Sequence, residues 1–516
     1  MEEIIIRGGT IVDGTGAPGY RGDIAVSGGK ITAIGDLKNV QAEKYLDAEG
    51  MIVAPGFFDA HAHSDTSFLQ DDSCASKLYQ GITTEITGQC GASPFPARPG
   101  TEGKWESFAA FYEEFEEKHQ MAVNQAVMTG HGALRSCVMG KEDRAPTPDE
   151  MEKMKALLRR ELRAGAWGIS LGLEYSPGFF AKGEELAELG KVVKEFDGII
   201  PCHMRSEGLH IHEAMDELFS VGKASGARVH ISHLKLDHYS VHGNAKKVWA
   251  HIEKARTEGV RVSADLYPFL ASCTGLTIRC PSWALEGGDE MVVFHLQGER
   301  RQEIIDSLRQ HYFSAERAET CLFNDDDGCW PEIVGKTLRY VAEEYLHTRD
   351  YAEAAAEVLM RTKGNANCIF FVMDEGDMLF FLGQDTGIGS DGWALSGDPD
   401  KISNKPHPRS YGAVSEFFRL AREKNICSLE EAVRRVTSKA ADLLGMKDRG
   451  RLQIGMAADI TVFDAETIAP RSTYLDPVQL STGVCHVLVN GQIALENGLQ
   501  TKRRFGRFLR KSLGGD

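Results

Sequence analysis

The chain has 516 residues, of which 42% are hydrophobic and 26% charged, and its formal net charge at pH 7 is −17. This length predicts a large catalytic unit with accessory elements rather than one simple core. Nucleic acids and anionic membranes attract basic surfaces, so we expect neither as a partner.

No apolar run reaches the ~18–20 residues that cross a bilayer. The N-terminus "MEEIIIRGG" has no basic segment before a long apolar one. We therefore expect a cytoplasmic protein whose eleven cysteines are reduced.

Both ends of the chain have the pattern of short strands broken by glycine turns. At the start these are residues 4–14, 22–35 and 44–56, and near the end residues 449–464 and 482–498. Apolar alternation with Gly-Gly turns is typical of antiparallel strands. The sequence predicts one small β-sandwich, built from residues 1–55 together with 450–516.

The middle of the chain alternates apolar runs with amphipathic segments, which indicates an α/β fold. The expected strands are 51–63, 82–91, 124–132, 166–175, 198–208, 227–235, 260–269 and 386–392. Eight such repeats predict a (β/α)8 TIM barrel over residues 56–449. A charged interval at about 283–345 interrupts the repeats and is expected to be an inserted lid or subdomain.

Residues that bind metals or transfer protons stand at the ends of five expected strands, where the chemistry of such barrels lies. In "APGFFDAHAHSD" two histidines are two residues apart, so on a strand they share a face. The set is His61, His63, Cys90, His203, His233 and Asp391. Imidazoles and a thiolate are preferred zinc ligands, and catalytic zinc keeps one position open for water. Asp391, after the glycine-containing "TGIGS", is the candidate general base and then acid.

Longer stretches resemble a known family. "PGFFDAHAHSD", "HISHLK", "GIGSDG", "GMAADITVFD" and "VLVNGQIA" resemble the amidohydrolase superfamily. "EITGQCGASPFP", "HMRSEG" and "HPRSYGAVSEF" narrow the resemblance to its D-aminoacylase (N-acyl-D-amino-acid deacylase) branch, from about residue 3 to about residue 510. The resemblance implies hydrolysis of the amide bond of an N-acyl-D-amino acid to a carboxylic acid and a free D-amino acid.

The resemblance also implies a ligand set. Cys90, His203 and His233 would bind one zinc ion tightly, and His61, His63 and again Cys90 would form a second, weaker position. Many relatives bridge two metals with a modified lysine on strand four, but "GISLGLEYSPG" has none. A bridging Cys90 thiolate is the alternative. Glu174 is either a rival bridging ligand or a supporting or exposed residue.

Substrate contacts follow from the same resemblance. Arg409 in "HPRSYG" would pair with the substrate α-carboxylate, which suits the two-pronged guanidinium. Lys235, two residues beyond His233, should face the same side and help. The remaining candidates are two phenols and one residue of "PFLASCTGL", namely Tyr175, Tyr267 and Ser272, with Cys273 as the alternative to Ser272.

Four other histidines are expected not to bind metal. His131 should be a supporting residue, His210 and His212 should lie in a loop or helix, and His230 should face away from His233 and pack outside the barrel.

Other functions stay open at this point. A cyclic-amide hydrolase such as a hydantoinase or dihydroorotase shares the two histidines and the aspartate but normally needs the missing lysine. A D-dipeptidase, or a deacylase that prefers acidic side chains, would use the same barrel. A non-catalytic scaffold would lose ligands, yet every required position is filled. Arg279 does not settle the preferred side chain, and the oligomeric state is open.

Overall fold

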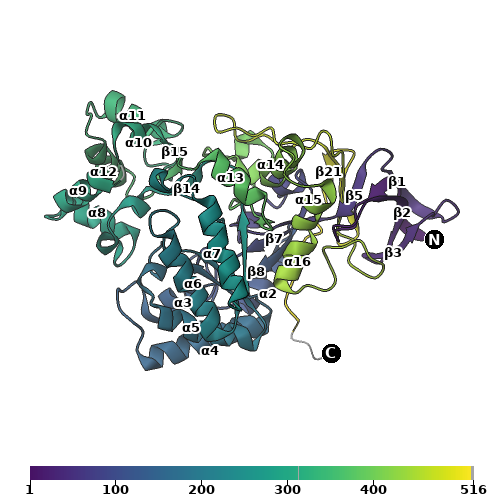
Figure 1. Ribbon diagram of the computed structural model, residues 1–516, viewed down its shortest axis with the longest axis horizontal. Coiled ribbons are helices and arrows are strands. Elements are labelled where there is room, and N and C mark those ends of the chain that lie inside the picture. The colour runs from purple at the N-terminus through teal and green to yellow at the C-terminus, as the bar shows by residue number, and fades with distance from the viewer. Residues whose placement is uncertain (312, 513–516) are drawn as a thin grey trace.

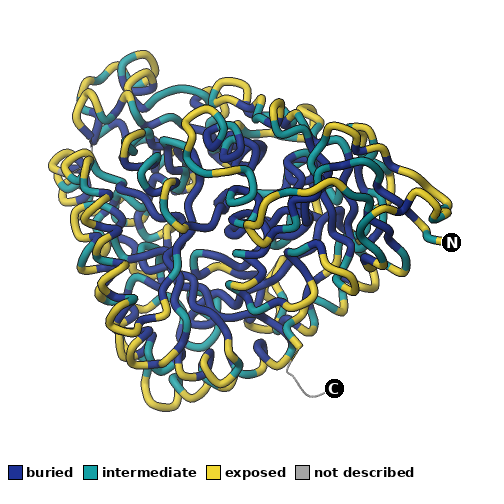
Figure 2. Tube along the Cα trace, turned by 45° about the vertical axis from the view of Figure 1, so that its right-hand side comes forward, coloured by how far each residue is buried: buried dark blue, intermediate teal, exposed yellow. Residues whose placement is uncertain are grey.

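The computed structural model describes residues 1–311 and 313–512. Strands from both ends of the chain lie at one side of the molecule, and a helical insertion lies at the opposite side (Figure 1). Between them is a central group of strands with helices around it. Each strand expected between residues 51 and 392 is present there. Buried segments concentrate in the middle of the molecule (Figure 2).

Nine strands from the two ends of the chain form one hydrogen-bonded sheet. They are β1 (Glu2–Ile11), β2 (Tyr20–Ser27), β3 (Lys30–Gly35), β4 (Ala42–Asp47), β5 (Ile52–Pro55), β18 (Ile460–Phe463), β19 (Val484–Val489), β20 (Gln492–Glu496) and β21 (Leu499–Gln500). The long strand β1 pairs antiparallel with β2 on one edge and parallel with β4 and then β5 on the other. Antiparallel pairing of β5 with β18 joins the two ends of the chain. The division into domains at residues 55 and 450 stays a prediction.

The central strands are parallel and nearly all of their residues are buried, as expected for strands covered by helices on one face and packed on the other. One sheet has the order β17-β13-β12-β11-β10-β9 and the other β6-β7-β8. Their bounds are β6 (Phe57–Asp59), β7 (Ile82–Thr87), β8 (Asn124–Val127), β9 (Thr129–Gly130), β10 (Ile169–Gly172), β11 (Ile199–His203), β12 (Arg228–Ile231), β13 (Val262–Leu266) and β17 (Gly387–Ile388).

Helices follow these strands and cover them. They are α1 (Ala75–Leu78), α2 (Phe108–Lys118), α3 (His131–Met139), α4 (Pro148–Ala164), α5 (Gly183–Glu195), α6 (Ile211–Ser225), α7 (Ala245–Thr257), α13 (Glu375–Leu382), α14 (Arg409–Glu423), α15 (Leu429–Arg435) and α16 (Ser438–Leu444). The helix expected from "MEKMKALLRRELRAG" is α4, which begins with a capping box at Thr147 and Glu150 and ends at Gly165 in left-handed backbone. Within the described residues, no helix combines the length and the apolar character needed to span a membrane.

The insertion has a hydrophobic core of its own. Its strands β14 (Ser272–Gly275), β15 (Cys321–Asp325) and β16 (Asn367–Phe370) form an antiparallel sheet in the order β14-β16-β15. Its helices are α8 (Asp289–Gln297), α9 (Arg301–His311), α10 (Ala315–Glu319), α11 (Leu338–Tyr340) and α12 (Tyr351–Arg361). The buried core runs from Leu276 to Phe370, a longer stretch than the expected 283–345, because β14 and β16 pair at its two ends.

The end of the chain leaves the terminal sheet and returns to the central strands. Gly506 forms a β-bridge to Met121, just before β8, and Phe508 forms one to Gln125 within β8. The Trp167 indole donates a 2.6 Å hydrogen bond to the Leu509 carbonyl oxygen. The last described residues therefore pack on the central strands and not on the terminal sheet, to which the sequence analysis assigned them.

A buried ion pair joins the ends of β6 and β17, from which several site residues follow. The Lys77 ammonium donates to Asp59 Oδ2 at 2.7 Å and to Ser390 Oγ at 2.8 Å. The other oxygen of Asp59 accepts from the backbone N–H groups of Ser390 at 2.7 Å and His61 at 3.3 Å. The side chains of Lys77 and Asp59 are fully buried. Asp59 therefore fixes two strand ends relative to each other.

We expect Lys77→Met to lower stability strongly, by about 3–5 kcal/mol, because it leaves the buried Asp59 carboxylate without its cation. Scanning calorimetry should show a fall in Tm of several degrees, whereas the exposed control Lys246→Met should match the parent chain. Equal Tm values for all three proteins would contradict this assignment.

Candidate active site

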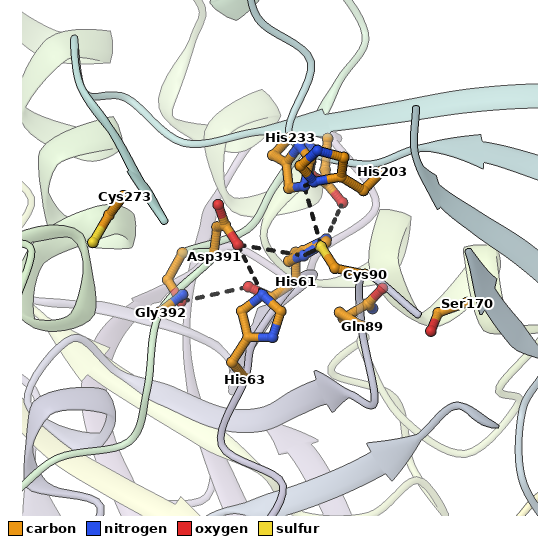
Figure 3. A network of polar contacts seen from close by, with 12 residues as sticks. His61, His63, Gln89, Cys90, Ser170, His203, His233, Cys273, Asp391 and Gly392 are labelled. Atoms are coloured by element: carbon orange, nitrogen blue, oxygen red, sulfur yellow. Dashed lines mark hydrogen bonds and ion pairs between the residues drawn. The ribbon is translucent and has the colours of Figure 1, made fainter. Parts of the chain in front are cut away.

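The predicted metal and proton-transfer residues come together at the carboxyl ends of the central strands (Figure 3). Each of the strands β7, β11, β12 and β17 ends in, or is followed by, one of these residues, and β6 is followed by two of them. These residues are His61, His63, Cys90, His203, His233 and Asp391. Segments up to 330 positions apart in sequence thus meet at one place.

The Cys90 thiol lies at the centre of this group. Its Sγ is 3.3 Å from Nε2 of His61 and 3.3 Å from Nε2 of His233. Asp391 Oδ1 is 2.9 Å from His63 Nε2 and 3.6 Å from His61 Nε2. One potential ligand atom from each of His61, Cys90, His233 and Asp391 lies within 4.8 Å of all the others.

His203 extends the group on the side of β10 and β11. Its Nδ1 is 3.0 Å from His233 Nε2, and its Nε2 is 2.8 Å from Glu174 Oε2. Glu174 therefore contacts a predicted ligand, and it is the partly exposed member of the pair, with 26% of its side-chain surface accessible.

Three of these residues have left-handed backbone, which is rare outside glycine. The φ angles are 52° at Cys90, 39° at His233 and 52° at Asp391. Such conformations cost of order 1–3 kcal/mol each and concentrate at functional sites. Each of the three lies just beyond its strand, and the sharp turn brings its side chain back over the strand ends.

Electrostatics set the charge of each group. Burial and the charge of His233 lower the pKa of His61 well below its ordinary value, so the imidazole is neutral at pH 7. Burial and the negative charge of Asp391 raise the pKa of the Cys90 thiol well above its usual value. Burial opposes ionisation of Asp391 too, but the Arg409 charge and the neighbouring histidines hold the pKa of that carboxyl well below its usual range.

These properties fit zinc. Burial lowers the pKa of His61 and of His233, so both imidazoles have a free lone pair, whereas Glu207 and Glu174 raise the pKa of His203. Imidazole nitrogens and a cysteine sulfur this close together are a borderline-soft donor set, which zinc prefers. The buried thiol needs a nearby cation to ionise, and a bound metal ion supplies one.

Two buried carboxylates that the sequence analysis did not single out support the histidines. Glu207 Oε1 is 2.9 Å from His233 Nδ1, and its Oε2 is 2.5 Å from the Lys235 ammonium. Asp265 on β13 accepts the His233 backbone N–H at 2.6 Å and lies 3.9 Å from His61 Nδ1. A carboxylate behind a metal-binding imidazole fixes its tautomer and orientation. The sequence contained a clue to each of these carboxylates. Glu207 belongs to "HMRSEG", and Asp265 is a charged residue inside an otherwise uncharged strand.

The expectation that His230 faces away from the site and packs outside the barrel is wrong. Its Nε2 lies 2.7 Å from Asp265 Oδ2, the oxygen that His61 also approaches. Strand alternation placed His230 opposite His233, but β12 ends at Ile231 and His233 lies beyond it in left-handed backbone. His230 is nevertheless not among the described residues whose donor atoms could share a metal ion. His131 makes a buried contact to Glu185 at 2.9 Å, and His210 and His212 lie at the start of α6.

A cavity of about 410 Å³ opens beside the predicted metal and proton-transfer residues, of which His63, Cys90 and Asp391 line it. Arg409, the first residue of α14, has Nη1 2.8 Å from Asp391 Oδ2, and its guanidinium lies 4.9 Å from the Tyr267 ring centre. Tyr175 also lines the cavity, with its hydroxyl 3.3 Å from Thr274 Oγ1.

The other expected substrate contacts are placed differently. Cys273 lines the cavity, whereas Ser272 is buried outside the lining. The Lys235 ammonium contacts Glu207 and His233 and does not reach the cavity wall. The Tyr267 ring packs against the Arg409 guanidinium, and its buried hydroxyl has no hydrogen-bond partner among the residues that the structure describes.

Comparison with known proteins agrees with this geometry. The model of the amidohydrolase family matches residues 44–273 and 388–495, on either side of the insertion. The chain belongs to the amidohydrolase family. It is 33% identical to an N-acyl-D-glutamate deacylase of Alcaligenes xylosoxydans xylosoxydans over 99% of this chain and 96% of that one. It is 32% identical to a D-aminoacylase of the same organism, over 99% and 98% of the two chains. Within the family it therefore falls in the D-aminoacylase branch.

A solved structure is similar over its whole length. The N-acyl-D-glutamate deacylase of Bordetella bronchiseptica, crystallised with zinc and a phosphonate mimic of the tetrahedral intermediate, has a TM-score of 0.85 and 32% identity. The similarity covers 99% of both chains. The fold is therefore that of the amidohydrolases.

We expect Asp265→Asn to weaken zinc binding about 10- to 100-fold, since an amide supports the adjacent imidazoles less well than a carboxylate. Competition with a chelator measures the affinity. Asp216→Asn is a matched control, because Asp216 forms a similar 2.8 Å pair with His251 at the surface. Parental zinc affinity in Asp265→Asn would show that Asp265 has no role in holding the histidines.

Proposed function

We propose that this protein hydrolyses the amide bond of N-acyl-D-amino acids, releasing a carboxylic acid and a free D-amino acid. The observation that carries the proposal is the contact of Cys90 with the buried His61 and His233, beside a cavity whose wall includes Cys90, Asp391 and Arg409. The full-length similarity to deacylases of D-amino-acid derivatives supports the substrate class, including its handedness.

The family resemblance suggests which residues would hold zinc, and His233 belongs to both groups of close donor atoms, one with His61, Cys90 and Asp391 and one with His203 and Glu207. Cys90, His203 and His233 would bind one ion tightly, and His61 and His63 would share Cys90 with a second, weaker one. Zinc at these residues supplies a Lewis acid that activates water and polarises the scissile carbonyl group.

Asp391 is placed to move the proton. It is ionised at neutral pH, and its Oδ1 faces the histidines while its Oδ2 faces Arg409. Oδ1 would accept a proton from the attacking water and donate it to the amide nitrogen, which leaves as the free amine. Asp391 ends the cycle in its starting form.

Arg409 would bind the substrate α-carboxylate. Its guanidinium is buried and lines the cavity, and burial of a cation is tolerated where a carboxylate partner neutralises it. Tyr175 at the same cavity would contact the carboxylate or the scissile carbonyl. Lys235 would act through Glu207 rather than on the substrate directly.

The alternatives fit less well. A hydantoinase-like cyclic-amide hydrolase needs a lysine after strand four, where this chain has Leu173 and Glu174. A D-dipeptidase would use the same catalytic groups on a different leaving amine. A scaffold without catalysis would not need the buried thiol, the ionised Asp391 and the cavity together.

We also propose that the central strands close into an eight-stranded barrel. Backbone hydrogen bonds continue across both sheet boundaries, from Trp167 N–H to Val127 O at 3.0 Å and from Ala60 N–H to Ile388 O at 3.0 Å. Closure would explain why strands distant in sequence present their ends to one centre.

Asp391→Asn should retain zinc but lower kcat by about 10²- to 10⁴-fold, because an amide cannot relay the proton. Metal analysis and steady-state kinetics on an N-acetyl-D-amino acid measure the two quantities. Near-normal turnover with full zinc content would refute the role of Asp391.

Arg409→Met should lower kcat/KM for N-acetyl-D-amino acids by about 10- to 100-fold, since hydrogen bonds to charged groups are worth about 1.5–3 kcal/mol. Arg409→Lys keeps the charge but loses the two-pronged geometry, so it should recover part of the loss. Unchanged kinetics in the methionine variant would assign the carboxylate to another residue.

A further inference from the structure

The cavity is positively charged although the protein is strongly acidic. Its lining contains three cationic side chains, Lys104, Lys141 and Arg409, and one carboxylate, Asp391. Asp391 and Arg409 neutralise each other at 2.8 Å. Two lysines therefore remain without a matching acid in the cavity wall, in a chain of net charge −17.

Both lysines line the cavity, with Lys104 exposed and Lys141 half-buried. Helix α3 runs along the wall: Ala133 in its first turn donates to the Gly91 carbonyl oxygen beside Cys90, and Lys141 follows its last turn. A rise of about 1.5 Å per residue places Gly140 about 12 Å beyond Gly132 along the helix. Lys104 belongs to the loop after β7, which folds back so that Trp105 N–H donates to Pro94 O at 2.9 Å.

Arg409 lies on another side of the ligand group. It begins α14, after β17, and its Nη2 is 3.4 Å from the Cys273 carbonyl oxygen. If the substrate α-carboxylate meets Arg409 and the scissile carbonyl lies at Cys90 and Asp391, the part of the cavity wall that α3 provides is left for the acyl group. Small residues, Gly91, Ala92, Gly132 and Ala133, line that part of the cavity and leave room for a chain.

We propose that the preferred acyl group carries its own terminal carboxylate, as succinyl and glutaryl groups do, and that Lys104 and Lys141 bind it. The inference rests on the proposed function and specifies its substrate class. Lys141 has one acidic neighbour, Glu290 at 3.7 Å, whose side chain is 70% exposed. The Lys104 side chain forms no ion pair among the described residues. An ammonium group on a flexible stem suits the mobile end of an acyl chain, because it needs no fixed geometry.

General attraction of anions is a different explanation for the same charges. Such steering raises the association rate of every anion and also favours a doubly charged substrate over a singly charged one, but it depends on the summed charge of the protein. Direct binding of an acyl carboxylate instead depends on Lys104 and Lys141 themselves, so their removal abolishes the preference while removal of an exposed lysine elsewhere does not.

The test compares N-succinyl-D-leucine with N-pentanoyl-D-leucine, which has a neutral acyl chain of similar length, on the zinc-loaded enzyme. We expect kcat/KM to be about five- to tenfold higher for the succinyl compound, the effect of two partly exposed ion pairs. The ratio should fall towards one in the double variant Lys104→Met, Lys141→Met, and also at high salt. The exposed control Lys246→Met should keep the parental ratio.

Other outcomes have definite meanings. A parental ratio near one, or a ratio that the double variant leaves unchanged, overturns the inference while cleavage of N-acetyl-D-leucine upholds the proposed function. A lysine-dependent preference for N-acetyl-D-glutamate over N-acetyl-D-glutamine would show that the lysines face the amino-acid side chain, which also overturns it. If none of these compounds is hydrolysed, the proposed function fails as well.

Discussion

The chemistry of this protein depends on three polar atoms that share a small buried space: Sγ of Cys90 and Nε2 of His61 and His233. Burial raises the pKa of the Cys90 thiol and lowers that of His61, so both side chains are neutral at pH 7. A positive ion between these atoms would let the thiol ionise, and the neutral imidazole already has a free lone pair to offer it. Asp391 gains from the same arrangement, because the histidines and Arg409 keep it ionised.

The fold keeps these atoms together through buried carboxylates rather than through packing alone. Asp59 joins the ends of β6 and β17, Asp265 holds the backbone of His233, and Glu207 contacts its ring. Buried charges are costly unless they are paired and hydrogen-bonded, and each of these carboxylates has such partners. The ends of the strands are thus rigid where the ligands emerge, which suits a site that must position its groups closely.

The insertion and the central strands have separate tasks. The family match covers the strands that carry the ligands and omits residues 274–387. Yet Cys273, Thr274 and Asn367 at the edge of the insertion form part of the cavity wall. The proposed catalytic groups therefore come from the part that the family model matches, while part of the cavity wall comes from the insertion, from the loop after β7 and from α3.

Local sequence determined much of this protein. Apolar runs of the right length located the central strands, and residues such as His61, Cys90 and Asp391 stood out because metal-binding types follow buried strands. Tertiary structure alone decided how those residues face one another. Alternation predicts direction only within a regular strand, and His233 lies past the end of one in left-handed backbone, which is why the expectation for His230 failed. The roles of Glu207 and Asp265, and the choice of Cys273 over Ser272 at the cavity, depend on contacts between distant segments that no local pattern encodes.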